Sequence, residues 1–81
     1  MDIKNLVGMA NRIGDFFESM PNQDEAKKEI AMHISKFWEP RMRETLIANL
    51  GNESTSNLHP AIRAAVQENL DLLATKKRAV A

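Results

Sequence analysis

KFWEPRMR, at residues 36–43, marks a corner between two predicted helices in this 81-residue chain. Proline inside a helix removes a backbone hydrogen bond and clashes with the preceding turn, and it pushes the residue before it into extended geometry. Proline is also favoured at the first position of a helix. Pro40 is therefore expected to end one helix and to begin the next. The WEPR sequence predicts a tight helix–helix junction.

Apolar residues at spacings of three and four predict helices on both sides of this corner. The helix before it is expected to follow Asn22 and to run to about Trp38, because Asn22 and Glu25 have the spacing of a capping box. The helix after it is expected over residues 41–50, with Gly51 as its C-terminal cap. The same spacing predicts a longer helix at each end of the chain.

The first of these outer helices is predicted over residues 3–20, with Asp2 as its N-cap. It contains Gly8 and Gly14, each of which costs about 1 kcal/mol relative to alanine inside a helix. Close approach of another helix is the expected reason for glycine at these positions. The last helix is predicted to start at Pro60.

These patterns predict an all-α fold, a small helical bundle of three longer helices plus a short one after the WEPR corner. No strand-like alternation of useful length and no internal repeat is present. Residues 1–74 are expected to form a single helical domain that includes an exposed polar linker at about residues 52–57. Residues 75–81 are expected to form a basic, flexible C-terminal tail.

The amino-acid composition argues against several classes of function. The chain has 11 basic and 11 acidic residues, and this balance argues against a general nucleic-acid or membrane-surface binder. It has no cysteine, which excludes disulfides, iron–sulfur ligation and thiolate zinc. No stretch has the pattern of a signal peptide or a membrane span, so a cytoplasmic protein is expected.

The sequence contains no recognisable catalytic, cofactor or metal motif. His33 and His59 are far apart and neither has metal-ligand spacing, while nucleotide-binding and serine-nucleophile motifs are missing. His59, directly before Pro60, is expected to occupy the start of a helix. We therefore predict no catalytic, cofactor-binding or metal-binding residues in this chain.

The corner itself offers the best candidate for a binding surface. Phe37 and Trp38 are adjacent, so on a helix their side chains project about 100° apart and cannot easily share one core. A surface aromatic beside arginines is typical of protein interfaces. Packing of Trp38 under the proline corner is an equally weighted alternative. The predicted partner-binding residues are Phe37, Trp38, Glu39, Pro40, Arg41 and Arg43, with Phe16 and Phe17 beneath or beside them.

Two other readings stay open. Arg41, Arg43 and the basic run Lys76–Arg78 would be the contacts of a small nucleic-acid-binding or protein-interaction module. The second open hypothesis is a helical bundle that associates with itself, because a homodimer would cover an exposed apolar face of the isolated chain.

Two long stretches of the chain resemble one protein family. MANRIGDFFESMP at residues 9–21 and HISKFWEPRMR at residues 33–43 resemble the delta subunit of the cytoplasmic, NAD-dependent, molybdenum-containing formate dehydrogenases. The resemblance continues more weakly through HPAIRAAV at residues 59–66, so it covers about residues 3–70. A generic amphipathic helix would not contain an asparagine, a glycine, an aspartate and then two adjacent phenylalanines in this order.

The resemblance implies an accessory subunit with no redox centre of its own. In that family's enzymes the large alpha subunit carries the molybdenum cofactor and iron–sulfur clusters and oxidises formate to carbon dioxide. The beta and gamma subunits carry flavin and further clusters and reduce NAD. The delta subunit is implied to bind this complex and to support its assembly, cofactor retention or stability. The resemblance assigns no catalytic residue to this chain.

Overall fold

The computed structural model describes residues 2–74, and every regular element within that range is helical. The elements are α1 (Ile3–Phe17), α2 (Gln23–Phe37), α3 (Pro40–Ala48), the 3₁₀ helix η1 (Glu53–Thr55), α4 (Pro60–Glu68) and α5 (Leu70–Leu73). The predicted all-α fold is confirmed, including the short helix after the corner. Within residues 2–74, no helix combines the length and the apolar character needed to cross a membrane.

Both predicted side-chain caps at the starts of the long helices are confirmed. The carboxylate of Asp2 accepts a hydrogen bond from the backbone N–H of Lys4 at 2.9 Å. The side-chain oxygen of Asn22 accepts one from the backbone N–H of Glu25 at 3.0 Å. Each cap satisfies a backbone donor that the first turn of a helix leaves without an internal partner.

The WEPR corner is also confirmed. Trp38 and Glu39 are extended, with ψ angles of 136° and 152°, and Pro40 is the first residue of α3. The carbonyl of Glu39 then accepts the first hydrogen bonds of α3, from the backbone N–H groups of Met42 and Arg43. Proline thus turns the chain without leaving a backbone donor unpaired, because it has none to offer.

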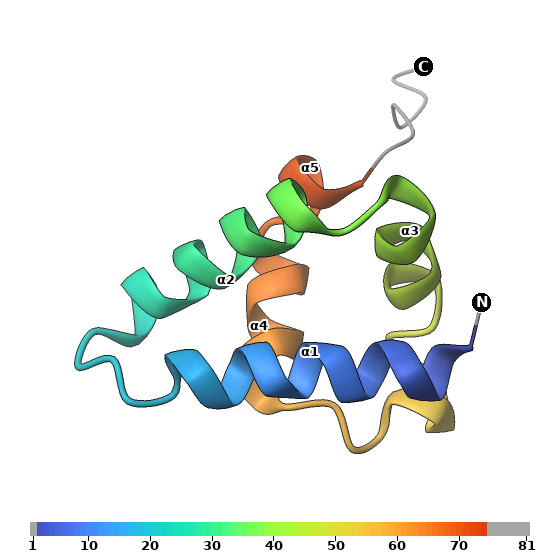
Figure 1. Cartoon of the computed structure of the whole chain (residues 1–81), viewed down its shortest axis with the longest axis horizontal. Helices are drawn as coiled ribbons and strands as arrows, with labels where there is room; N and C mark the ends of the chain where they lie inside the picture. Colours follow the sequence, from blue (N-terminus) through green and yellow to red (C-terminus); the bar gives the residue numbers. More distant parts are fainter. Residues whose placement is uncertain (1, 75–81) are drawn as a thin grey trace.

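The helices enclose one apolar core (Figure 1). α1 and α2 form an open V, α4 runs across the space between them, and α3 with η1 closes the end near the N-terminus (Figure 1). α5 lies against the C-terminal part of α2. The buried core residues are Leu6, Val7, Ala10, Ile30, Ala31, Ile34, Trp38, Leu46, Leu58, Ile62, Ala65, Val66 and Leu73.

Two predicted helix ends are wrong. α1 stops at Phe17, three residues before Met20, and its last turn tightens through a hydrogen bond from the N–H of Glu18 to the carbonyl of Asp15 at 3.4 Å. α3 ends at Ala48 with Asn49 as its C-terminal cap, and Gly51 does not adopt the positive φ of a glycine cap. Asn49 closes α3 with its own side chain, because its Nδ2 donates to the carbonyl of Thr45 at 2.7 Å.

The segment predicted as an exposed polar linker, residues 52–57, is mostly exposed, but it is anchored to the core at Thr55. Thr55 is fully buried within η1, and its hydroxyl donates to the carbonyl of Asn49 at 2.7 Å. Arg63 of α4 donates to the carbonyl of Leu50 at 2.6 Å and also to the carbonyl of Thr55. These bonds satisfy backbone acceptors that follow α3, so the polar residues of this segment hold the chain rather than leave it free.

The last predicted helix is divided at Asn69. The side-chain Nδ2 of Asn69 donates to the carbonyl of Ala65 at 2.8 Å, and its backbone N–H donates to the carbonyl of Val66 at 3.3 Å. Asparagine competes in this way with the regular helical pattern. The break separates α4 from α5, while Leu73 remains buried as the pattern predicted.

One ion pair links α2 to α4 at the surface. Nζ of Lys27 lies 2.9 Å from a carboxylate oxygen of Glu68 and 3.5 Å from one of Asp24. The hydrogen bond to Glu68 raises the pKa of Lys27 above its ordinary value of 10.5. Because the pKa of Lys27 is raised, the contribution of its charge to stability is present at neutral pH and is lost as the pH rises through the alkaline range.

Candidate functional site

The two adjacent aromatics of the corner separate as their angular spacing requires. Trp38 is only 5% exposed and belongs to the core, whereas Phe37 is 70% exposed. The alternative in which Trp38 packs under the proline corner is the one the structure shows. Its predicted role as a partner contact does not agree with this burial, and Phe37 is the aromatic that faces solvent.

Arg43 is also a structural residue of the corner. Its Nη1 donates to the carbonyls of Ser35 at 2.8 Å and Trp38 at 3.1 Å, and its Nε donates to the carbonyl of Leu73 at 3.1 Å. These acceptors lie at the C-terminal ends of α2 and α5, where a helix leaves its last carbonyls without partners. Arg43 is therefore engaged inside the chain and is not free to serve the predicted contact surface or a basic patch.

The remaining corner residues are exposed at the start of α3. Glu39, Pro40 and Arg41 line an open depression together with Glu44. Their candidate role stays a prediction. The basic run Lys76–Arg78, predicted to accompany them, lies outside the described residues.

A continuous aromatic strip extends from α1 to α2. It consists of Phe16, Phe17, His33 and Phe37, and we call it the aromatic strip. The ring centroids are 5.0 Å apart for Phe16 and Phe17, 6.5 Å for Phe17 and His33, and 4.7 Å for His33 and Phe37. The structure thus connects Phe16 and Phe17 to Phe37 through the ring of His33.

The strip has one half-buried side and one exposed side. Phe17 packs partly against the core, whereas Phe16 is 75% exposed. An open hollow of about 260 Å³ lies between the helices there, with Arg12 and Ile13 completing its lining. The sequence pattern did not identify Arg12 and His33 as members of this surface. Arg12 stands four residues before Phe16, and His33 stands four residues before Phe37. Residues four apart share a helix face, so this spacing could have identified both as members of the surface.

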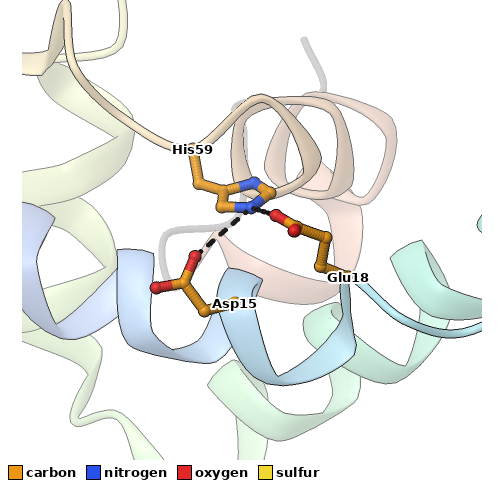
Figure 2. Close-up of side chains that lie close together, drawn as sticks. All are labelled: Asp15, Glu18 and His59. Carbon is orange, nitrogen blue, oxygen red and sulfur yellow. Dashed lines mark hydrogen bonds and ion pairs between the residues drawn. The ribbon is translucent and has the colours of Figure 1, made fainter.

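A second cluster lies where the start of α4 meets α1 (Figure 2). Nε2 of His59 lies 2.9 Å from Oε1 of Glu18 and 3.7 Å from Oδ1 of Asp15. Nδ1 of the same ring accepts the backbone N–H of Ala61 at 3.1 Å, so His59 caps α4 as its predicted position before Pro60 suggested. We call His59, Asp15 and Glu18 the histidine latch.

Asn11 reinforces the latch one turn earlier on α1. Its Oδ1 accepts the backbone N–H of His59 at 2.7 Å, and its Nδ2 donates to the carbonyl of Asn57 at 3.1 Å. A single amide side chain therefore pairs two backbone groups of the segment that leads into α4. Asn11, Asp15 and Glu18 recur every three or four residues and so lie along one face of α1.

Gly14 explains how the ring of His59 reaches this face. A methyl group on Gly14 would lie 2.6 Å from Cγ and 2.8 Å from Cδ2 of His59, closer than real contacts allow. The predicted close approach is thus confirmed for Gly14. It is wrong for Gly8, which has nothing within 4 Å of the same position.

The latch brings together atoms of the kinds that bind metal ions, all within 4.8 Å of one another. The hydrogen bonds, however, assign the ring nitrogens of His59. Since Nδ1 accepts from Ala61, the proton of the neutral ring resides on Nε2, which donates to Glu18. A metal at Nε2 would take the place of that proton, and the neutral ring would then carry its proton on Nδ1. Nδ1 could no longer accept from Ala61, so the cap of α4 would be lost. The geometry therefore favours a structural latch.

Comparison with known proteins places the chain in context. The sequence model of a protein family described as NADH-dependent formate dehydrogenase delta subunit, FdsD, matches residues 5–66. This range includes both the aromatic strip and the histidine latch. No curated protein and no solved structure matches the chain.

Proposed function

The chain belongs to the NADH-dependent formate dehydrogenase delta subunit family, and we propose that it acts as a non-catalytic subunit that binds the formate dehydrogenase complex and supports its assembly, cofactor retention or stability. The observation that carries this proposal is the family match, which spans most of the chain. The aromatic strip supports this proposal, because exposed apolar patches on small domains commonly mark binding sites.

Under this proposal the partners are the large alpha subunit and the beta and gamma subunits of the enzyme. The molybdenum cofactor, iron–sulfur clusters, flavin and NAD sites would then lie in those partners, and the complex would work in the cytoplasm. This chain would contribute surface complementarity instead of chemistry, with its internal polar residues committed to holding the fold.

The physical mechanism is mass action. A subunit that binds only the cofactor-competent conformation of its partner stabilises that conformation according to its concentration relative to its dissociation constant. At a concentration about 100 times that constant, the stabilisation is about 2.7 kcal/mol. Such a shift is enough to change how much of the partner retains its cofactor.

The test compares the purified enzyme complex from cells with and without this subunit. We expect less molybdenum per alpha subunit and lower formate-dependent NAD reduction in its absence, while the KM for formate of the remaining active enzyme stays unchanged. Supplying the chain during expression should restore both quantities. Full molybdenum loading together with full activity in the deletion strain would contradict the proposal.

A further inference from the structure

We propose that the aromatic strip is the docking surface of this chain, and that its occupant is an apolar segment of a formate dehydrogenase subunit with carboxylates beside it. This inference rests on the function proposed above and specifies the chemistry of the contact. It is carried by the exposure, the shape and the surrounding charge of the strip.

The exposure of the strip is unusual for such large side chains. Phe16 and Phe37 are 75% and 70% exposed, although a chain of 81 residues has few large side chains for its core. They lie at opposite ends of the strip and on different helices, so burying both requires one contact that spans α1 and α2. Aromatic residues at such positions are typical binding hot spots.

The shape indicates an apolar occupant. Beside Phe16 and Phe17, the open hollow extends over Ile13 and against His33, with a volume of about 260 Å³. Its lining is mainly hydrocarbon, and a protruding aliphatic or aromatic side chain would exclude water from it. Anchors of this kind, inserted into a pocket at the centre of a contact, dominate binding at protein interfaces.

The surrounding charge indicates carboxylates in the occupant. Arg12 is exposed one helical turn before Phe16, and Lys36 is exposed directly before Phe37. Neither forms an ion pair with another residue of the described part of the chain. Each end of the strip therefore has a basic group available for a partner.

Three acidic residues near the strip contact other residues of the chain. Asp15 and Glu18 face His59 at the latch, and Asp24 faces Lys27. Opposite charges around an apolar contact steer association and fix its register. A partner segment with carboxylates beside its apolar residues would match the arginine at the hollow.

Glu25, Glu29 and Glu39 are exceptions, because all three are exposed and form no ion pair within residues 2–74. Glu39 follows Phe37 by two residues, so the charge at that end of the strip is mixed. Arg12 lines the hollow itself, and we therefore place the carboxylates of the partner at this end of the strip.

The experiment measures binding of the purified chain to a purified formate dehydrogenase complex that lacks it, at low and high salt. Phe16→Ala and Phe37→Ala are each expected to weaken binding about tenfold or more. Arg12→Glu is expected to weaken it at low salt, and the difference from wild type should shrink at high salt because screening removes the repulsion. Leu72→Ala is the matched control, since Leu72 is 50% exposed but lies on α5 outside the strip; we expect its affinity to stay within about twofold of wild type.

A photoreactive amino acid in place of Phe16 then identifies the contacting segment. The expected adduct is a peptide of a partner subunit in which aspartate or glutamate stands beside large apolar residues. Thermal unfolding of each variant, followed by circular dichroism, should match wild type and so exclude a folding defect as the cause of weaker binding.

The outcomes separate the two proposals. Failure of the wild-type chain to bind the complex would overturn the proposed function itself. Wild-type binding that both phenylalanine variants retain would overturn the strip as the docking surface. Loss of binding in these variants with no effect of Arg12→Glu would overturn the carboxylate-bearing occupant. If the same variants abolish only self-association, as measured by light scattering, the occupant is a second copy of this chain and the inference is wrong.

Discussion

The C-terminal half of α1 has two faces with opposite fates. On one face, Asn11 and Glu18 contact the segment around His59, and these polar groups find their partners within the chain. On the other face, Phe16 and Phe17 begin the aromatic strip, whose two ends, Phe16 and Phe37, are exposed to water. The same short stretch of sequence thus supplies an internal fastening and an unpartnered surface.

This contrast reverses the usual expectation about reactive side chains. A histidine with two carboxylates has the composition of a catalytic or metal site, but its hydrogen bonds give it a structural role between α1 and α4. Phenylalanine is usually a core residue, but Phe16 is exposed. What identifies a candidate site is therefore which groups the fold leaves unsatisfied.

Gly14→Ala is the substitution expected to disturb the latch face most. Overpacking of this kind typically costs about 1–3 kcal/mol, and the better helix propensity of alanine returns about 1 kcal/mol of it. We expect a net loss of up to about 2 kcal/mol in the free energy of unfolding, measured by urea denaturation. The physical reason is that the new methyl group would displace the ring of His59.

Gly8→Ala is the matched control on the same helix. Nothing lies within 4 Å of a methyl group at Gly8, so only the helix propensity changes. The expected result is a gain of about 0.5–1 kcal/mol in the free energy of unfolding. Equal effects of the two substitutions would show that the ring of His59 does not depend on Gly14.

His59→Ala is expected to have a smaller effect than Gly14→Ala. It removes the cap of α4, worth about 1 kcal/mol, together with an exposed contact to Glu18 that contributes little. The sharper measurement is a double-mutant cycle. With the ring removed, most of the cost of Gly14→Ala should disappear, because only the Cβ of residue 59, at 3.0 Å, still lies close to the new methyl group.

A full cost of Gly14→Ala in the His59→Ala background would contradict the latch geometry. Asp15→Asn is a suitable companion variant. At 3.7 Å from Nε2, Asp15 is the weaker of the two carboxylate contacts, so its amide should change the free energy of unfolding by less than about 0.5 kcal/mol.

Sequence patterns predicted the helices because short-range chemistry determines them. Asn22 caps α2 and Pro40 begins α3 through contacts with residues close in sequence, and these contacts can be anticipated from residue type. One error has another cause. The segment around Thr55 was predicted as an exposed linker because it is polar, and most of it is exposed, but Thr55 is buried and Arg63, eight residues later, pairs with its carbonyl. Tertiary contacts of this kind leave no local signature.

The candidate site shows the same division. The sequence indicated that Phe37 and Trp38 face different directions, but not which of them faces the core. That choice depends on the path of α3 and α5 around the corner, where Arg43 joins the ends of two helices. The latch was not predicted either, since Glu18 and His59 are separated by 41 residues.

Phe16→Ala is expected to change the stability of the chain very little. It is also the strongest test of the contrast between the two faces of α1. Because Phe16 is 75% exposed, its truncation removes little buried area, and alanine is a better helix former than phenylalanine. We expect the free energy of unfolding to change by no more than about 0.5 kcal/mol, in contrast to Gly14→Ala two residues earlier. If Phe16→Ala instead destabilises the isolated chain as much as Gly14→Ala does, the ring is part of the core in solution. The aromatic strip would then stabilise the fold, and exposure of Phe16 would no longer support a role in binding.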